Sequence, residues 1–439
     1  MSEIPCEALL YVGCRPHGIP PQARVLVLER PDDVSRAAEL RDWLRRYVPS
    51  SRSRLMQVSP HGYAVPSWVG AVVGSHMQRL ATGRSTIAKF GAAWARNVVR
   101  TLRRQPRWAT TAREPWAGRP VLVVGAGVDL DRNGHLLAEA QRRGPVVALN
   151  SSAGCCAHYG VTPDVIVCCE VNGFPEHVRP FIDNGRTLIV LDALASTDTW
   201  AAASGAAGIF LHEPYFAPYL IQLGVMPLHY STSSSTAATS LALLWGASEI
   251  VLVGHSHACD GEAYAMGSPF RGNVATVADG LVTYEGGGKE PYTISAVLRQ
   301  GWNGGDPVWS DHTFSPVIEW YAAVAERETI INTTEGGSDI PGTYCEPLAS
   351  VIERYPIVES VWVAGMEAPD TSAVLAGIER QARDVVESGA TEWPVDFPLL
   401  GMWVVPVMEQ ATIAKRRAAV AEAVQRGARE ILETLREAT

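Results

Sequence analysis

The sequence PVLVVGAGVDLDRN, residues 120–133, contains the pattern that decides the fold: an apolar strand, a glycine-rich turn and the start of a helix. Further apolar runs of strand length follow, and segments of helical length separate most of them. These runs are Val146–Asn150, Asp164–Glu170, Thr187–Asp192, Gly208–His212, Glu249–Gly254 and Thr329–Thr333. Apolar strands that alternate with helices indicate a parallel sheet covered on both faces. The sequence therefore predicts an α/β fold with a doubly wound, mostly parallel, Rossmann-like sheet.

Smaller regions flank this sheet domain. Two strand patterns and three helical patterns precede it, over Ala8–Gly13, Arg24–Glu29, Pro31–Tyr47, Ser67–Leu80 and Ser85–Arg104. They predict a small N-terminal α/β and helical region, and the aperiodic, proline-containing stretch 104–120 is typical of a linker. Helical patterns over Ser372–Ser388 and Ile413–Ala438 predict a C-terminal helical region whose last helix serves packing or dimerisation. We place the domain limits at 1–116, 117–350 and 351–439.

Composition restricts the class of protein. The 439 residues are 47% hydrophobic and 19% charged, which is typical of a globular chain with material for a large core. Uninterrupted apolar runs of 18 or more residues, which a membrane span needs, are absent from the sequence. The first residues, MSEIPCEALLYVG, lack the basic start and cleavage site of a secretion signal. We therefore expect a cytoplasmic protein.

Charge is unevenly distributed. The stretch Arg79–Arg119 holds ten basic residues and one acidic residue, so it carries +9 while the whole chain carries −9 and the remainder −18. Such a band fits an anionic partner, for example a nucleotide, an acidic glycan or a membrane surface, but also a solvated helix face. The acidic remainder argues against a dedicated nucleic-acid binder.

The sequence contains two pairs of consecutive cysteines, Cys155–Cys156 and Cys168–Cys169, which at first resemble the ligands of a metal site. Neighbouring residues of a strand point to opposite faces, however, and rarely bind one ion together. We expect reduced, buried thiols without a metal.

The turn after the first strand of the sheet is a candidate phosphate site. Gly125 and Gly127 let a backbone approach a phosphate, and the following helix start favours an anion. The turn lacks the third glycine of a dinucleotide fingerprint and the Lys-Ser/Thr pair of a P-loop, so a plain strand-to-helix turn stays open. Asn150 and Ser151 end the second strand, where they either bind a base, a ribose or a sugar hydroxyl, or cap a helix.

Other polar groups follow later strands. Ser231–Gly246 begins with six hydroxyl residues and continues as an apolar helix, a combination that predicts an anion cradle or an N-cap. In Gly254–Tyr264, Tyr264 offers a phenol to a phosphate oxygen, and two histidines near an aspartate permit a metal site without completing one. His312 precedes a helix and is a candidate general base.

The order of these pieces resembles the motility accessory factor family of bacterial flagellin glycosyltransferases. The resemblance rests on GAGVDLDRN, VALNSSAG, GVTPDVIV, the hydroxyl-rich turn before SLALLWGASEIVLVG, and INTTEGGSDIPGT, and it covers about 230 residues. The same core is shared by archaeal 6-hydroxymethylpterin diphosphokinases and is similar to bacterial CMP-sialic acid-dependent sialyltransferases.

The likeness to the sialyltransferases implies roles for individual residues. Their glycine turn, strand-end asparagine and Thr-Ser pair at a helix start match Gly125 and Gly127, Asn150, and Ser233 with Ser234. Their phosphate-binding tyrosine matches Tyr264, and their general base matches His312. The implied donor-site residues are Gly125, Gly127, Asn150, Ser151, Ser233, Ser234, Ser235 and Tyr264. Further candidates for the same cleft are Asp129, Glu170, His255, His257, Asp260, Thr334 and Glu335.

Departures from the relatives affect the same positions. Gly-Pro-Ser-Leu is replaced by Gly127-Val128-Asp129-Leu130, and Gly-Gln-Asp-Leu by Gly254-His255-Ser256-His257. The asparagine of the sialyltransferases' first turn is Ala126, and their second tyrosine has no counterpart near Cys259. The donor therefore differs, or activity is reduced.

Three functions remain open. The first is a glycosyltransferase that moves a nonulosonic acid from a CMP-activated donor to a protein or glycan hydroxyl without a metal. The second is a diphosphokinase that acts on a pterin-like hydroxymethyl group with ATP and Mg²⁺, for which Asp129, Asp260 or Glu170 are candidate ligands. The third is a non-catalytic nucleotide-binding or scaffold protein. A homo-oligomer is compatible with all three.

Overall fold

The structure is a computed structural model that divides into two units, Met1–Gly91 and Ala92–Thr439. It describes residues 8–12, 24–28, 36, 39–40, 43–44, 67–171, 175–182, 184–209, 217–259, 261–358, 363–390, 397, 399, 402 and 416–437. In the first unit, β1 (Ala8–Val12) and β2 (Arg24–Leu28) lie where the strand patterns predicted them, and the two strands pair in parallel. The helix predicted over Pro31–Tyr47 lies largely outside the described residues.

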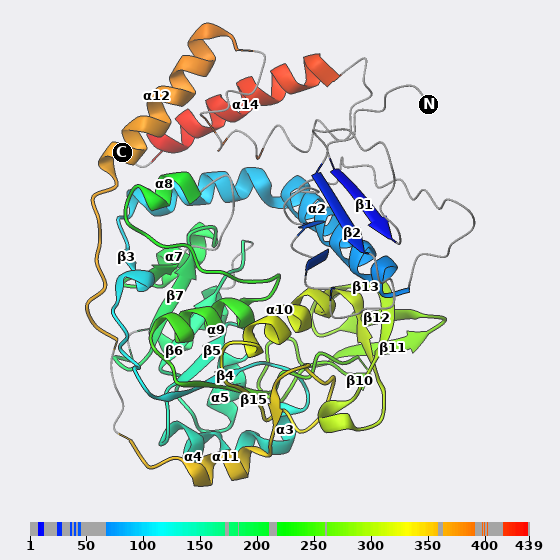
Figure 1. The fold of residues 1–439 in the computed structure, drawn as a ribbon. Helices are drawn as coiled ribbons and strands as arrows, with labels where there is room; N and C mark the ends of the chain where they lie inside the picture. The colour runs from blue at the N-terminus through cyan, green and yellow to red at the C-terminus, as the bar shows by residue number, and fades with distance from the viewer. Residues whose placement is uncertain are drawn as a thin grey trace. The chain divides into compact units, whose positions relative to one another are not determined.

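The second unit contains a parallel sheet with the strand order β16-β15-β9-β4-β5-β6-β7-β8-β3. Figure 1 labels most of its strands along the chain. The strands are β3 (Arg107–Trp108), β4 (Pro120–Val124), β5 (Val146–Leu149), β6 (Val165–Cys168), β7 (Leu188–Asp192), β8 (Ala207–Ile209), β9 (Glu249–Val253), β15 (Ile330–Asn332) and β16 (Tyr344–Cys345). All seven predicted strands are present, so the doubly wound sheet is confirmed.

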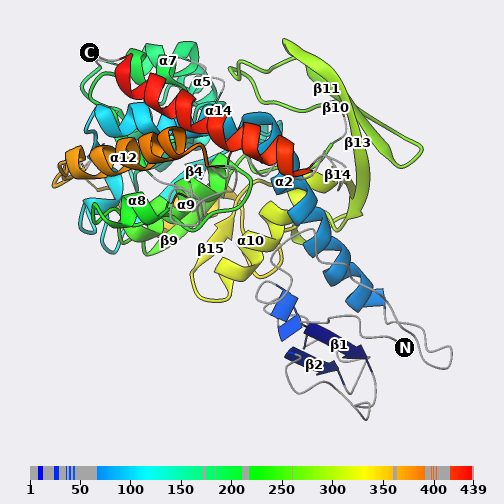
Figure 2. The same cartoon turned by 90° about the horizontal axis from the view of Figure 1, so that it is seen from above.

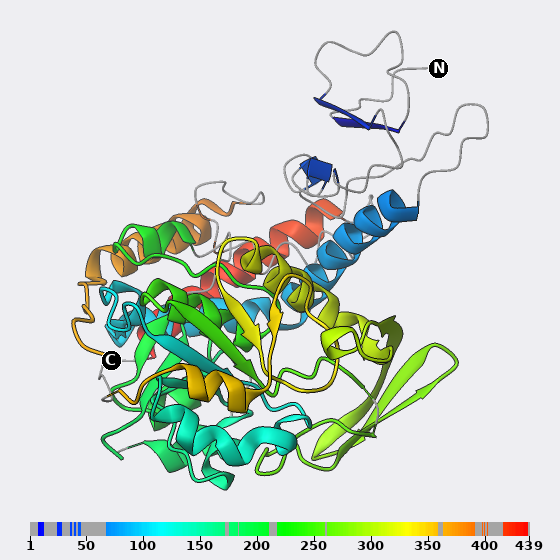
Figure 3. The ribbon, with the colours of Figure 1, turned by 60° about the horizontal axis from the view of Figure 1, so that its bottom comes forward.

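The sheet is buried on both faces. Leu122 and Val124 of β4 pack into one apolar cluster, whereas Val121 and Val123 pack into another. This alternation explains why the strands read as continuous apolar runs. Helices cover both clusters: α3 (Leu130–Asn133), α4 (Leu137–Gln141), α5 (Ala153–His158), α6 (Pro175–Val178), α7 (Thr197–Ala202) and α11 (Leu348–Arg354) carry residues of the first, and α9 (Ser234–Leu244) and α10 (Ser315–Ala325) of the second. Figure 3 shows α4 and α11 side by side.

A second, antiparallel sheet follows β9, and the sequence patterns did not predict it. Its strands are β10 (Gly261–Glu262), β11 (Asn273–Ala278), β12 (Leu281–Gly286), β13 (Lys289–Arg299) and β14 (Val308–Asp311), hydrogen-bonded in that order. Figure 2 shows its long strands. Its inner face buries Cys259, Ala275, Val282 and Tyr284. The missed signal was Asp279-Gly280, both at positive φ, between two alternating strands.

Two sequence interpretations need correction. The helical patterns before and after residue 83 form one helix, α2 (Ser67–Arg103), because an isolated interior glycine does not end a helix. The stretch 104–120 is no solvated linker: it contains β3 and the 3-10 turn Ala109–Thr111, and Trp108 and Trp116 are fully buried. Trp116 meets Trp245 edge to face, with ring centroids 4.7 Å apart.

The C-terminal region is helical, as predicted. It contains α12 (Ser372–Ser388) and α14 (Arg416–Arg436), which pack on each other. Arg96 and Arg100 of α2 form ion pairs with Glu430 and Glu437 of α14. These two arginines of the basic band therefore pair with acidic residues of α14, which neither the anionic partner nor the solvated helix face had predicted.

The remaining described helices are short or lie at the edge of the fold. They are α8 (Ala217–Ile221) and the 3-10 turns Gly134–Leu136, Arg179–Phe181, Trp302–Gly304 and His312–Phe314. Among the helices that the structure describes, none has the length and apolar character to cross a membrane.

Cys168 and Cys169 lie against opposite clusters of the sheet, as predicted for neighbours at a strand end. Cys155 and Cys156 instead lie in the helix α5, where both are fully buried. Burial raises the pKa of the Cys155 thiol and of the Cys168 thiol to about 12, so both remain protonated near neutral pH.

Trp116→Ala tests whether the supposed linker belongs to the core. We expect the substitution to lower the free energy of unfolding by about 3–5 kcal/mol, because it leaves a cavity against Trp245. Denaturant unfolding followed by far-UV circular dichroism measures the change. The exposed Met226 provides a control, since Met226→Ala should change stability by less than about 0.5 kcal/mol. Equal effects of the two substitutions would show that residue 116 is not a core position.

Candidate functional site

The strand order reverses between β4 and β9. From β4 the chain continues through β5, β6, β7 and β8 on one side, and then returns to add β9 on the other side of β4. Open parallel sheets bind ligands beyond the carboxyl ends of the strands at such a reversal. The turns after β4 and β9 are therefore the centre of the candidate site.

The glycines of the first turn allow it to pack on the second. The Gly125 N–H donates to the Val253 carbonyl at 2.8 Å, and the Gly127 N–H donates to the Gly254 carbonyl at 2.9 Å. A Cβ atom would lie 2.6 Å from the Gly254 oxygen at position 125, and 2.7 Å from it at position 127. The close approach of two backbones thus requires both glycines, and a role in phosphate binding stays a prediction.

Tyr264 lies directly over this turn. It forms a bridge pair with Gly127, and the next residue, Ala265, donates its N–H to the Ala126 carbonyl at 2.9 Å. The segment that carries Tyr264 therefore continues the hydrogen bonding of the glycine turn. The two predicted donor-site elements are brought together.

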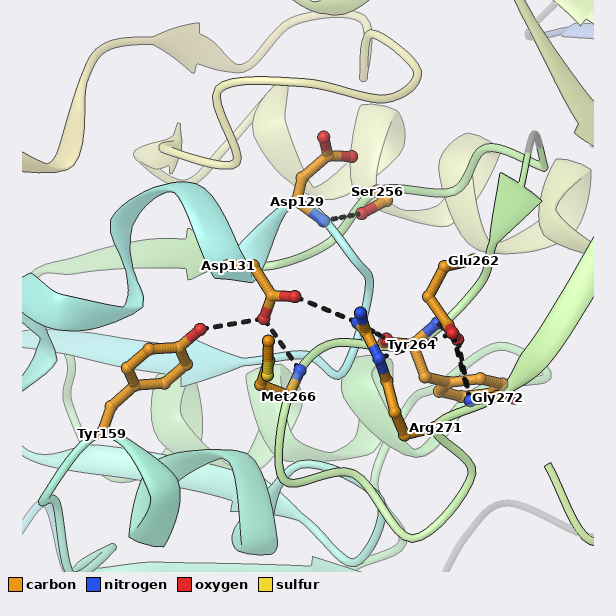
Figure 4. A network of polar contacts seen from close by, with 9 residues as sticks. All are labelled: Asp129, Asp131, Tyr159, Ser256, Glu262, Tyr264, Met266, Arg271 and Gly272. Atoms are coloured by element: carbon orange, nitrogen blue, oxygen red, sulfur yellow. Dashed lines mark hydrogen bonds and ion pairs between the residues drawn. The ribbon is translucent and has the colours of Figure 1, made fainter.

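A network around Asp131 holds the Tyr264 segment in place (Figure 4). The Asp131 carboxylate accepts the Tyr159 hydroxyl at 2.8 Å, the Met266 N–H at 2.8 Å and the Arg271 guanidinium at 3.0 Å. Arg271 also donates to the Tyr264 carbonyl at 2.6 Å, and the Glu262 carboxylate accepts the Tyr264 N–H at 3.2 Å.

The sequence analysis missed these charged residues because they contribute to the site only after distant segments meet. A carboxylate that follows the glycine turn by four residues was the available signal for Asp131. Figure 4 shows that Asp131, and not Asp129, faces the Tyr264 segment.

Asp129 is hydrogen-bonded to Arg132 and Ser256, away from the Tyr264 segment. It is buried, its carboxylate accepts the Arg132 guanidinium at 2.9 Å, and its N–H donates to the Ser256 hydroxyl at 3.2 Å. A Cβ at Gly336 would overlap with its carboxylate. Asp129 therefore has its negative charge compensated by an arginine.

The Tyr264 phenol lies in a region of negative charge. Burial, followed by the charges of Glu170 and Asp311, raises the pKa of Tyr264 to about 12. The phenol therefore keeps its proton near neutral pH and remains a hydrogen-bond donor. Glu170, from the end of β6, and Asp311, from the end of β14, are thus close enough to act on Tyr264.

The end of β5 carries three polar residues with different surroundings. Asn150 is buried, and Ser151 is half-buried. The Ser152 hydroxyl donates to the Val124 carbonyl at 2.6 Å and accepts the Leu149 N–H at 2.9 Å, so it ties this turn to β4. Asn150 and Ser151 remain candidates at the carboxyl edge of the sheet.

The hydroxyl residues that begin α9 are mostly engaged within the protein. Ser233 is the N-cap, and its hydroxyl accepts the Ser235 N–H at 3.2 Å. The Ser235 hydroxyl lies 2.9 Å from that of Ser233 and is also bonded to Tyr321. The Ser234 hydroxyl is hydrogen-bonded to the thiol of Cys169, the residue before Glu170.

His255 and His257 follow β9 and are held neutral. The His255 Nε2–H donates to the Val123 carbonyl at 3.0 Å, and burial lowers the pKa of His255 to about 4. Burial and the neighbouring His255 and Arg299 lower the pKa of His257 to about 3. The two rings are 5.8 Å apart between centroids. His257 has a positive φ of 44°, a conformation that strains a non-glycine residue.

Thr334 and Glu335 stabilise neighbouring turns. The Thr334 hydroxyl accepts the His255 N–H at 3.1 Å. The Glu335 carboxylate accepts the Leu348 N–H at 3.0 Å, at the start of α11, and the Asn133 amide at 3.1 Å. Asp260 lies outside the described residues.

His312 begins the 3-10 turn that follows β14. Its side chain is half-buried, and the preceding residue, Asp311, is one of the two carboxylates that act on Tyr264. The antiparallel sheet therefore brings the His312 segment toward the carboxyl edge of the parallel sheet. Its catalytic role stays a prediction.

We call Gly125, Gly127, Tyr264, Glu170 and Ser234 the carboxyl-edge site. Tyr264 pairs with the glycine turn, the charge of Glu170 acts on the Tyr264 phenol, and the Ser234 hydroxyl is bonded to Cys169, which precedes Glu170. Within the described part of the chain, no three His, Cys, Asp or Glu residues are arranged to hold a metal ion.

Comparisons with known proteins agree with this core. Residues 95–261 match the family model described as 6-hydroxymethylpterin diphosphokinase MptE-like, so the chain contains an MptE-like domain. This confirms the resemblance to that core. The solved structure of the MAf glycosyltransferase from Magnetospirillum magneticum AMB-1 is similar over 94% of this chain and 69% of that chain, with 14% identity and a TM-score of 0.49. The search of curated proteins found no match.

Gly127→Ala tests the close approach of the two turns. We expect the substitution to lower the free energy of unfolding by about 1–3 kcal/mol, because the added methyl group overlaps with backbone that cannot move independently. A Cβ added at Gly377, inside α12, would meet no atom within 4 Å beyond the neighbouring backbone of its own helix, so Gly377→Ala should stabilise the protein by about 0.5–1 kcal/mol. Denaturant unfolding measures both. A neutral Gly127→Ala would show that the turns can separate without cost.

His255 predicts a pH dependence of stability. The unfolded chain binds a proton at this residue below about pH 6.5, whereas the folded chain does so only near pH 4, so acid favours the unfolded state. We expect His255 to contribute about 3 kcal/mol to the loss of stability between pH 7 and pH 4. Urea unfolding across this range measures the loss. His255→Asn, which cannot take up the proton, should show a shallower pH dependence, and an unchanged slope would contradict the assignment.

Proposed function

We propose that this protein is a glycosyltransferase that moves a nonulosonic, sialic-like acid from a CMP-activated donor to a hydroxyl group of a protein or glycan. The observation that carries the proposal is the placement of Tyr264, which pairs with Gly127 at the strand reversal and carries a phenol that is protonated near neutral pH, with a pKa raised to about 12. A neutral phenol there is suited to donate a hydrogen bond to the phosphate of a departing nucleotide.

The charge around Tyr264 favours one type of nucleotide. Glu170 and Asp311 oppose the binding of a highly charged anion beside the phenol. A CMP-linked nonulosonic acid carries one negative charge on its phosphodiester and one on the carboxylate of the sugar, whereas the triphosphate of ATP alone carries several. Without a cation, the carboxyl-edge site therefore suits a CMP-linked donor better than ATP. The proposed reaction requires no metal.

His312 is the proposed general base. It accepts the proton of the acceptor hydroxyl as the hydroxyl oxygen bonds to the anomeric carbon of the sugar. The bond between that carbon and the CMP phosphate breaks in the same step, and CMP leaves with its phosphate hydrogen-bonded to Tyr264. Position supports this assignment, since His312 directly follows Asp311, which acts on Tyr264.

A second candidate function is an ATP- and Mg²⁺-dependent diphosphokinase of a pterin-like substrate. The family match over residues 95–261 favours it. The residues fit Mg²⁺ less well, because Asp129 is paired with Arg132 and Glu170 is the remaining described candidate. A non-catalytic nucleotide-binding protein is the third candidate, favoured by the departures around His255 and His257.

A thermal-shift panel of CMP, CDP, GDP, and ATP with and without Mg²⁺ tests the three functions. A ligand at 100 times its Kd adds about 2.7 kcal/mol to the apparent stability. Stabilisation by CMP without a metal supports the glycosyltransferase. Stabilisation by ATP only with Mg²⁺ supports the diphosphokinase, and an unchanged melting temperature in every arm contradicts both enzymes.

His312→Ala and Tyr264→Phe should separate chemistry from binding. We expect His312→Ala to reduce transfer by about 10²–10⁴-fold with CMP affinity nearly unchanged, because a base acts only as the bond forms. Tyr264→Phe should weaken CMP binding as well, because it removes a donor to the phosphate. Initial rates with a CMP-linked nonulosonic acid and calorimetric titration with CMP provide the two readouts.

The exposed His135 is a matched control, and His135→Ala should change neither readout. Unchanged turnover in His312→Ala would end the proposed mechanism.

A further inference from the structure

We propose that Asp311 and Tyr284, two polar residues inside the antiparallel sheet, are positioning residues that hold His312 in place for proton transfer. The inference rests on the proposed function, because it assigns these residues to the same reaction. Neither residue contacts the substrate in the proposed mechanism. Both act through the turn that carries His312.

Asp311 caps the turn that His312 begins. It is the last residue of β14 and only 3% exposed. One of its carboxylate oxygens, Oδ1, accepts the Thr313 N–H at 2.8 Å and also the Thr313 hydroxyl. Because these bonds span residue 312, they restrict the backbone of His312 from both sides.

Tyr284 holds the other oxygen of the same carboxylate. The Tyr284 hydroxyl lies 2.6 Å from Asp311 Oδ2 and 3.0 Å from the Cys259 sulfur. A phenol has one proton, and a carboxylate is a stronger acceptor than a thiol, so Tyr284 donates to Asp311. Burial raises the pKa of Cys259 to about 11, and its protonated thiol can therefore donate to the Tyr284 oxygen. All of these bonds keep the carboxylate in one orientation.

The far end of the turn is also held. The Arg299 guanidinium donates to the hydroxyl of Ser315, the first residue of α10. The Phe314 ring packs against His257, with centroids 5.4 Å apart. His312 therefore lies on a short segment with hydrogen bonds at both ends.

The surroundings distinguish this network from ordinary core packing. Tyr284 belongs to an apolar cluster with Ala275 and Val282, where a carboxylate and a phenol are costly to bury unless they are paired. Asp311 also raises the pKa of Tyr264, so the charge of this buried pair acts on the carboxyl-edge site. Because Tyr284 bonds to Asp311, and Asp311 bonds to the turn that carries the proposed base, the pair is suited to position the His312 side chain.

A double-mutant cycle of Tyr284→Phe and His312→Ala tests the proposal. Tyr284→Phe removes only the hydroxyl, and we expect kcat to fall about 10–100-fold, with the KM for the donor unchanged, because a small displacement of a catalytic group is costly. In the His312→Ala background the same substitution should cause no further loss, since there is no imidazole left to position. An equal loss in both backgrounds would overturn the proposal in favour of a purely structural role.

Thr283→Val is a matched control on the same strand. It removes the Thr283–Thr293 hydroxyl contact of the opposite face and should leave kcat unchanged. Far-UV circular dichroism of each variant establishes that the fold is retained.

A readout without activity separates this proposal from the proposed function. The rate at which diethyl pyrocarbonate modifies His312, followed by mass spectrometry of its peptide, reports how firmly the turn is held. Tyr284→Phe should accelerate modification of His312, with no change at the exposed His135, and an unchanged rate would overturn the positioning role. If no donor supports transfer while Tyr284→Phe still accelerates modification, the proposed function fails and the positioning role stands.

Discussion

The close approach of two turns at the strand reversal is the constraint on which the rest of the site depends. Gly125 and Gly127 bring the backbone after β4 against the backbone after β9, and Gly254 accepts from Gly127. Ser256, two residues later, receives the Asp129 N–H, and the Gly337 segment packs directly against its carbonyl. Three loops from distant parts of the sequence thereby meet at one edge of the sheet. They lie so close together that a Cβ atom at Gly125, Gly127 or Gly337 would overlap with the backbone of a neighbouring loop. Tyr264 can pair with Gly127 only because the turn is held this close.

Charge organises the site around that contact. Asp131 and Glu262 are balanced by Arg271, and together they hold the Tyr264 segment. Glu170 and Asp311 have a different effect, because they place negative charge near the phenol and, together with its burial, raise its pKa. The site therefore combines a protonated phenol and serine hydroxyl groups with nearby carboxylates. Such surroundings favour ligands of low charge, or ligands that bring a cation.

The antiparallel sheet connects the two halves of the proposed chemistry. The sheet begins at β10, beside Tyr264, and ends at Asp311. One insertion of about 50 residues therefore contains the tyrosine that is proposed to donate a hydrogen bond to the phosphate, and it leads directly into the proposed base, His312. The sheet is narrow, and its inner face has a small core around Val282 and Tyr284. Hydrogen bonds from Asp311 and Arg299 to the following turn supply order that this small core does not provide by itself.

Local pattern alone determined the parallel sheet. Each strand is a continuous apolar run because it is buried on both faces, and all seven predicted strands occur where the runs lie. The same logic located Gly127, Tyr264 and Ser234 at the carboxyl edge. The tertiary structure decided what these residues contact: a second backbone for Gly127, a charged network for Tyr264, and Tyr321 for Ser235. It also turned the stretch around Trp108 and Trp116 into core. The periodicity of burial depends on residues that are neighbours along the chain, so it can be recognised in the sequence. Contacts between segments about 130 residues apart form only when the chain has folded.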